Sequence, residues 1–304
     1  MQVRAQPPTH SAPLRLFPSP QPLSNPSPGG RGVHRPSMNR LADTFARLDT
    51  QGRKALIPFL TAGDPSLEAT VPAMHALVEA GADVIELGVP FSDPMADGPT
   101  IQRSSERALA RGAGLRYVLE TVSAFRRDDA TTPVVLMGYL NPVEIHGTAR
   151  FAEEAVAAGV DGVLLVDLPP EESAETLTVF ADAGLDLIVL ASPTTSDARI
   201  DLLCEAARGY LYYVSFAGVT GADRLDTRAA GDRLRQLRAR CPVPVVAGFG
   251  IKDAASAKAM AVDADGVVVG SALVAALAEA GSPQAAREAA LAFLTPLRQA
   301  LDAG

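Results

Sequence analysis

Residues 157–165 read AAGVDGVLL, and a similar pattern occurs at three other places: EAGADVIEL at 79–87, DAGLDLIVL at 182–190 and AVDADGVVV at 261–269. Each copy ends a helical pattern, turns at glycine or at Asp-Ala-Asp, and places an aspartate at the entrance of an apolar run. Such a turn is typical of the loop between a helix and the next strand of a repeated βα unit. The pattern therefore predicts parallel strands that alternate with helices.

Apolar runs predict eight strands, at 54–60, 83–89, 133–138, 161–166, 186–191, 210–214, 243–248 and 265–269. They are continuous Val/Ile/Leu runs, as expected of strands buried on both faces. Helical spacing fills the segments between them, and Pro72 predicts that the helix after the first strand either begins near Thr70 or is kinked there. The strand count favours an α/β fold of the (βα)8 barrel type as a single domain. An open doubly wound sheet is the alternative.

The first 37 residues differ in composition from the rest of the chain. They contain nine prolines, several serines and glycines, and no Asp or Glu. Such a segment cannot bury enough apolar surface to offset its ordering entropy. We therefore expect residues 1–37 to be a disordered leader, absent from the mature protein if Met38 is the functional start, and residues 38–304 to be the catalytic domain. A transit peptide, and hence an organelle location, is the alternative to the cytoplasm.

Charge and composition exclude several classes of function. The formal net charge is −8, and because residues 1–37 carry four arginines and no acid, residues 38–304 carry −12. This acidic body argues against nucleic-acid binding, and no apolar run is long enough for a membrane helix. Cys204 and Cys241 are isolated in the sequence and lack metal-ligand spacing. We expect both to be buried, reduced thiols.

Two carboxylates near the second predicted strand are the strongest catalytic candidates. Glu86 interrupts an apolar strand, and Asp97 follows in a loop rich in proline and glycine. Functional groups of a (βα)8 barrel lie at the carboxyl ends of strands and in the loops that follow. Two carboxylates in different environments suit an acid–base pair. The alternative for Glu86 is a structural ion pair or hydrogen bond.

Glycines after the last three strands predict a phosphate site. They occur in AGVTG at 217–221, in AGFGI at 247–251 and in GS at 270–271, where a helix begins. Backbone amides and a helix N-terminus bind phosphate at this place in barrels. The alternative is that these residues only form turns and helix caps.

Other chemistries lack the residues they need. A Schiff-base enzyme requires a desolvated lysine, yet the three lysines lie at a strand entrance, in a helix and in a loop. The two histidines of the body are isolated, so we expect no metal. Phe59 and Tyr139 fall at strand ends, where they could line a pocket for a flat apolar ring.

The run ELGVPFSDPMADG at 86–98 resembles the signature of the tryptophan synthase alpha-chain family. PFLTAGDP at 58–65, AGVTG at 217–221, GFGI at 248–251 and GSALV at 270–274 match the same family in order and spacing. The resemblance covers roughly residues 40–300. It implies a (βα)8-barrel lyase of tryptophan biosynthesis, which cleaves indole-3-glycerol phosphate into indole and glyceraldehyde 3-phosphate in a retro-aldol step.

The resemblance also assigns roles to individual residues. Glu86 would protonate indole C3 and take the glycerol hydroxyl proton, and Asp97 would bind the indole N–H. Positions that match the indole pocket or support the carboxylates are Phe59, Thr61, Tyr139 and Tyr212, and Thr220 matches a mobile-loop threonine that contacts Asp97. The phosphate region is matched by Gly221, Gly248, Phe249, Gly250, Gly270 and Ser271. Asp64, Asp93 and Asp167 match positions at or near a partner contact.

The family implies a partner, the pyridoxal-phosphate-dependent tryptophan synthase beta chain, in an α2β2 tetramer. This chain itself is expected to need no cofactor. Three alternatives remain at this point: a stand-alone indole-glycerol-phosphate lyase, a non-catalytic barrel partner, and a different phosphate-binding barrel isomerase or aldolase. The leader has no counterpart in the family pattern, and the sequence leaves the conformation of loop 216–227 open.

Overall fold

Eight parallel strands close into a barrel in the order in which they occur along the chain. The structure is a computed structural model that describes residues 39–214, 227–248 and 250–303. The strands are β1 (Ala55–Thr61), β2 (Ile85–Gly88), β3 (Val134–Gly138), β4 (Gly162–Leu165), β5 (Asp186–Ala191), β6 (Leu211–Val214), β7 (Val245–Gly248) and β8 (Gly266–Val269). The predicted (βα)8 barrel is confirmed, and β1 pairs with β8 to close it.

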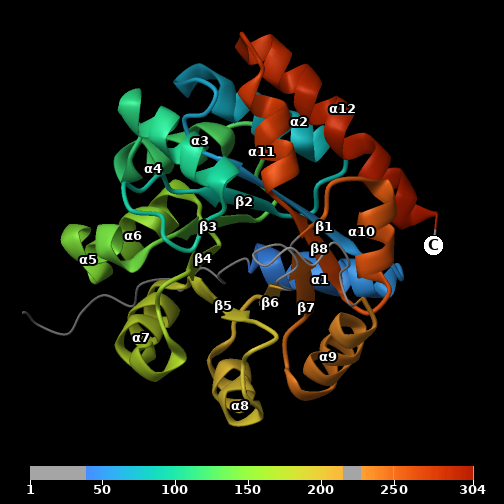
Figure 1. Cartoon of the computed structure of the whole chain (residues 1–304). Helices are drawn as coiled ribbons and strands as arrows, with labels where there is room; N and C mark the ends of the chain where they lie inside the picture. The colour runs from blue at the N-terminus through green and yellow to red at the C-terminus, as the bar shows by residue number, and fades with distance from the viewer. Residues whose placement is uncertain (1–38, 215–226, 249, 304) are drawn as a thin grey trace, which may run out of the picture. The chain divides into compact units, whose positions relative to one another are not determined.

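Helices surround the strands, as Figure 1 shows. They are α1 (Arg40–Thr50), α2 (Thr70–Glu79), α3 (Pro99–Ala110), α4 (Leu115–Phe125), α5 (Leu140–His146), α6 (Thr148–Ala158), α7 (Ala174–Ala183), α8 (Asp197–Ala206), α9 (Thr227–Arg240), α10 (Ala254–Ala261), α11 (Ser271–Ala278) and α12 (Pro283–Asp302). Two short 3-10 helices cover Leu67–Ala69 and Pro170–Glu172. The α-helix after β1 begins at Thr70, which places Pro72 in its first turn, where a missing amide donor does little harm.

The aspartates at the strand entrances explain the repeated sequence pattern. Asp83 accepts a hydrogen bond from the amide of Leu56 at 3.0 Å, and Asp161 accepts one from Val134 at 2.8 Å. Asp265 does the same for Val245 at 2.9 Å. In each of these three cases, the aspartate before an even-numbered strand accepts a hydrogen bond from a backbone amide at the start of the preceding strand. The repeated aspartate therefore ties neighbouring strands together at the amino-terminal end of the barrel.

Helix α1 closes that same end. Its apolar side, with Leu41, Phe45 and Leu48, is buried in one cluster with inward-facing residues from the strands. The guanidinium of Arg40 donates to Asp161 Oδ1 at 2.8 Å, and Asn39 caps the helix through the amide of Ala42. The barrel thus has an apolar floor formed by α1, and the opposite end is left for the functional site.

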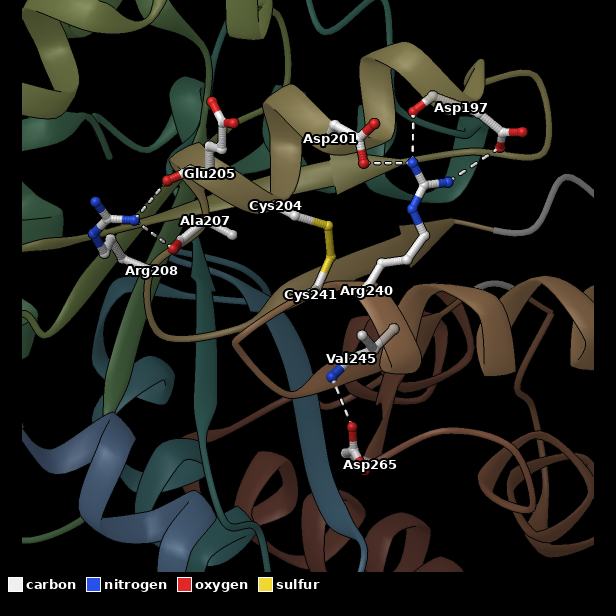
Figure 2. The surroundings of a disulfide bond; sticks show 10 residues. All are labelled: Asp197, Asp201, Cys204, Glu205, Ala207, Arg208, Arg240, Cys241, Val245 and Asp265. Carbon is white, nitrogen blue, oxygen red and sulfur yellow. Dashed lines mark hydrogen bonds and ion pairs between the residues drawn. A yellow bond between two sulfur atoms is a disulfide. The ribbon is translucent and has the colours of Figure 1, made fainter.

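The two cysteines correct one expectation. We expected separate reduced thiols, but the structure joins Cys204 and Cys241 in a disulfide with a Cα–Cα distance of 4.8 Å (Figure 2). Cys204 lies in α8 and Cys241 directly follows α9, and Arg240 next to it binds Asp201 of α8. The sequence prediction was wrong because 37 residues separate the pair, and only the side-by-side packing of α8 and α9 brings them within disulfide range.

The chain has no membrane-crossing helix in its described part, where none is both long and apolar enough to span a bilayer.

Candidate active site

Glu86 points into the barrel rather than toward the helices. Its neighbours Ile85 and Leu87 belong to the cluster between strands and helices, whereas Val84 belongs to the inner cluster above α1. Because side chains alternate along a strand, Glu86 faces inward with Val84. The side chain is completely buried, at 0% exposure. This settles the open question of its direction.

The Glu86 carboxyl has one protein partner and one free oxygen. The hydroxyl of Tyr210 donates to Glu86 Oε1 at 2.5 Å, while Oε2 is buried without a partner in the described residues. Burial raises the pKa of Glu86 to about 7, although the Tyr210 hydrogen bond lowers it. A carboxyl that is half protonated near neutral pH can both give and take a proton. Of the structural alternatives for Glu86, an ion pair is absent from its described surroundings, whereas a hydrogen bond, from Tyr210, is present.

Asp97 lies in the loop after β2 and is held by a residue of the next strand. The Tyr139 hydroxyl donates to Asp97 Oδ2 at 3.1 Å and accepts the amide of Ala96 at 3.0 Å. Burial raises the pKa of Asp97 to about 6, and the Tyr139 hydrogen bond opposes that shift. Burial thus raises the pKa of Asp97, like that of Glu86, toward neutral pH.

A pocket at the carboxyl end of the barrel gathers four of the predicted residues. Phe59, Thr61, Asp97 and Tyr139 line it. The remaining lining residues were missed from sequence: Gly88, Val89, Ile101, Ser105, Met137, Gly138 and Val166. Most of these are apolar or glycine residues at strand ends. Such residues are common in any barrel, so the one sequence signal for them was their position close to Glu86 or Tyr139 in the chain. The pocket thus combines apolar side chains with one carboxylate and the hydroxyl-bearing residues Thr61, Ser105 and Tyr139.

Thr61 lines this pocket, whereas Tyr212 lies in the inner cluster of the barrel. Thr61 shares a hydrogen bond of 2.6 Å with Ser104, and Ser104 donates to the carbonyl of Ile101. The Thr61 hydroxyl must then donate to Ser104, which leaves it only acceptor capacity toward the pocket. Tyr212 is an inner residue of β6, and burial together with the nearby Glu86 raises its pKa well above the ordinary value.

The predicted phosphate residues that the structure describes lie at the ends of β7 and β8 and directly after them. Gly270 caps α11 and lies beside Phe59, and Ser271 is the exposed first residue of that helix. Gly250 is exposed after β7 with a positive φ of 72°. Gly248 is buried at the end of β7, where a Cβ would overlap the Tyr212 hydroxyl. Thr220, Gly221 and Phe249 lie outside the described residues, as does most of loop 216–227.

The three aspartates that resemble partner-contact residues are also placed. Asp93 and Asp167 are exposed, and Asp167 accepts the amide of Leu140 at 2.8 Å. Asp64 is only 4% exposed, and Arg107 binds both of its oxygens, at 2.8 and 2.7 Å. In this chain the Asp64 carboxylate is therefore engaged in an internal ion pair.

Metal-ligand clusters are absent from the described part of the chain, which holds no group of three His, Cys, Asp or Glu side chains suited to an ion. The described residues form a (βα)8 barrel with one buried carboxyl, Glu86, in its interior and a second, Asp97, on the wall of a pocket. Burial raises the pKa of both groups. These features are typical of enzymes of the (βα)8-barrel class, which carry functional groups at the carboxyl ends of the strands.

Comparison with known proteins gives the family. The tryptophan synthase alpha chain family model matches residues 45–301. A tryptophan synthase alpha chain of Xanthomonas axonopodis pv. citri is 79% identical over 268 residues, which cover 88% of this chain and all of that protein. The chain belongs to the tryptophan synthase alpha-chain family, and it is accordingly a lyase.

Solved structures agree with this assignment. The tryptophan synthase subunit alpha from Legionella pneumophila is 47% identical, with a TM-score of 0.82 and coverage of 88% of this chain and 100% of that one. A structure of the tryptophan synthase α2β2 complex from Pyrococcus furiosus is 41% identical, with a TM-score of 0.75, covering 81% and 98%.

Proposed function

We propose that Glu86 and Asp97 are the acid–base pair with which this lyase cleaves indole-3-glycerol phosphate into indole and glyceraldehyde 3-phosphate. The single observation that carries the proposal is the state of Glu86. It is fully buried, it has a pKa of about 7, and its Oε2 atom has no partner within the described residues. A proton-transfer group needs these properties, because it must be available in both protonation states at neutral pH.

The chemistry can be assigned to the two carboxylates step by step. Protonated Glu86 gives its proton to C3 of the indole ring, which places positive charge on the ring and its nitrogen. Asp97, ionised, accepts the ring N–H and stabilises that charge as it builds. The Glu86 carboxylate then removes the proton of the glycerol hydroxyl. The carbon–carbon bond breaks, its electron pair returns to the ring, and the hydroxyl carbon becomes the aldehyde.

Substrate binding follows the two parts of the molecule. We assign the indole ring to the pocket with Phe59 and Tyr139, whose apolar wall suits a flat ring. The phosphate is assigned to Gly270 and Ser271 at the start of α11, where no side chain caps the helix. Gly250 would contribute to the same site, and so would Gly248, Gly221 and Phe249 by family likeness. Thr220 would contact Asp97.

The partner of this chain is the tryptophan synthase beta chain in an α2β2 tetramer, and the Pyrococcus furiosus relative is described in such a complex. Pyridoxal phosphate belongs to that beta partner, while the two carboxylates let this chain work without a cofactor. We assign the enzyme to the cytoplasm, in keeping with its bacterial relatives.

The domain assignment rests on composition and on the relatives. The 268 aligned residues of the Xanthomonas protein leave 36 of this chain's 304 without a counterpart. That number is close to the length of the proline-rich segment 1–37, which lies outside the described residues and which we propose as a leader ahead of the catalytic domain 38–304.

Indole release from indole-3-glycerol phosphate tests the proposal, measured with the full chain alone and with a beta chain. We expect slow turnover alone, a strong increase with the beta chain, and a loss of about a thousandfold or more in Glu86→Gln. Equal turnover with and without the beta chain would indicate a stand-alone lyase. No turnover in either case would indicate a non-catalytic partner or a different substrate.

A further inference from the structure

We infer that Phe45, on the helix that closes the barrel floor, is a positioning residue for Glu86 and acts through the ring of Tyr210. The inference rests on the proposed role of Glu86 in proton transfer. It connects the amino-terminal end of the barrel, where no substrate binds, with the functional end.

The first step is the contact between the two rings. The ring centroids of Phe45 and Tyr210 are 5.8 Å apart, with an angle of 48° between their planes. This is a tilted aromatic pair at a favourable distance. Phe45 is 6% exposed and Tyr210 is 0% exposed, and both belong to the inner cluster above α1. Phe45 therefore supports the Tyr210 ring from below.

The second step is the hydrogen bond at the other end of the same ring. The Tyr210 hydroxyl donates to Glu86 Oε1 at 2.5 Å, and 124 residues separate the two. A hydroxyl lies at the far end of the ring from the backbone, so a small tilt of the ring moves it appreciably. Hydrogen bonds weaken steeply when their geometry is lost. The support under the Tyr210 ring therefore affects the bond to Glu86.

The third step is the choice of Phe45 over its neighbours on α1. Leu48 is 2% exposed and belongs to the same inner cluster, but it has no ring to pair with Tyr210. Apart from burial, the group that shifts the pKa of Glu86 in the described residues is Tyr210, through its hydrogen bond. Burial raises the pKa of Tyr210 well above the ordinary value, so its hydroxyl stays neutral at working pH. The ring of Phe45 thus links α1 to the Tyr210 side chain, which makes the hydrogen bond to Glu86.

The experiment measures the titration of Glu86 directly, by carbon-13 NMR of the full chain labelled at the glutamate side-chain carboxyls. The Glu86 signal is identified by its loss in Glu86→Gln. Because the Tyr210 hydrogen bond lowers the pKa of Glu86, Tyr210→Phe should raise the titration midpoint. Phe45→Leu keeps an apolar side chain but removes the ring. We expect it to move the midpoint in the same direction by about half a pH unit, and Phe45→Ala to move it at least as far.

Two comparisons separate this inference from simple packing. Leu48→Ala, the matched control on the same helix, should leave the midpoint unchanged. In a Tyr210→Phe background, Phe45→Leu should cause no further shift, because the route from Phe45 to Glu86 is already removed. The pH profile of indole release should show the same pattern. An unmoved midpoint in Phe45→Leu, or an equal shift in Leu48→Ala, would overturn the inference.

The failure of this inference is distinct from failure of the proposed function. If Glu86→Gln kept full activity, Glu86 would lose its catalytic role, while the NMR midpoints would still report the contact through Tyr210. If Glu86→Gln were inactive and Phe45→Leu left the midpoint in place, only the role of Phe45 would be lost.

Discussion

The Tyr139 hydroxyl joins Asp97 to the backbone of its own loop. It donates to Asp97 Oδ2 at 3.1 Å and accepts the amide of Ala96 at 3.0 Å. One side chain at the end of β3 therefore holds both the carboxylate and the main chain of the loop that follows β2. The Tyr139 ring also packs on Phe91, with centroids 5.1 Å apart. Asp97 thus keeps its place at the pocket wall through a neighbouring strand.

Tyr139→Phe should change the pH dependence of the reaction. The Tyr139 hydrogen bond lowers the pKa of Asp97, so its removal should raise that pKa above about 6. A lost hydrogen bond of ~1 kcal/mol corresponds to a rise of about 0.7 in the pKa of Asp97. The ionised fraction of Asp97 at pH 6, and with it kcat/KM, should then fall about threefold. The pH profile of indole release checks this. A uniform decrease at every pH would show that Tyr139 contributes only as a pocket wall.

Glu86→Gln should alter how stability depends on pH. The pKa of Glu86 is about 7 in the folded chain and about 4.5 in the unfolded one. Between these values only the unfolded state releases the proton, so the free energy of unfolding falls as pH rises. The loss through Glu86 amounts to about 3 kcal/mol by the time pH passes 7.

Urea unfolding of both proteins at pH 5 and pH 8 measures this effect. Other buried acids contribute equally to the two proteins and cancel in the comparison. The stability of Glu86→Gln relative to the natural chain should therefore be higher at pH 8 than at pH 5. An identical difference at the two pH values would contradict the raised pKa.

Two glycines of the predicted phosphate region should respond differently to alanine. A Cβ at Gly248 would overlap the ring and hydroxyl of buried Tyr212, whereas a Cβ at Gly270 would have its nearest neighbour, Phe59, at 3.6 Å. Gly248→Ala should cost about 1–3 kcal/mol, as overpacked cores do. Gly270→Ala, the matched control, should change stability by less than about 1 kcal/mol. Thermal unfolding compares them, and equal melting temperatures would refute the steric account of Gly248.

The Cys204–Cys241 disulfide should stabilise the packing of α8 on α9. It closes a loop with a sequence separation of 37 residues, and such loops give about 2–4 kcal/mol. A reductant should lower the melting temperature of the natural chain but not that of the double variant Cys204→Ser, Cys241→Ser. Thiol titration of the unfolded, unreduced protein should find no free cysteine. Detection of two free thiols would show that Cys204 and Cys241 are reduced, as the sequence predicted.

Deletion of residues 1–37 should leave the melting temperature and the rate of indole release unchanged. The segment is rich in proline and has no acid, so we expect it to make no packed core with the barrel. Differential scanning calorimetry of the two chains measures this. A clear drop in melting temperature would show that the segment packs on the catalytic domain.

The sequence by itself determined the features that local patterns can express. Apolar runs predicted all eight strands to within two residues at each end, as for 186–191, because a buried parallel strand is apolar along its whole length. The entrance aspartates marked the turn from helix to strand before four of the eight strands, β2, β4, β5 and β8. Glu86 and Asp97 were found because a carboxylate in an apolar strand, and another in a glycine-rich loop beyond it, have few structural uses.

Only the tertiary structure decided the contacts between distant segments. The direction of Glu86 and its bond to Tyr210 depend on which face of β2 meets the barrel interior, and 124 residues separate the pair. The same holds for Cys204 with Cys241 and for Gly248 with Tyr212. Sequence periodicity describes one element at a time, whereas these relations arise from the way barrel closure and helix packing place elements side by side.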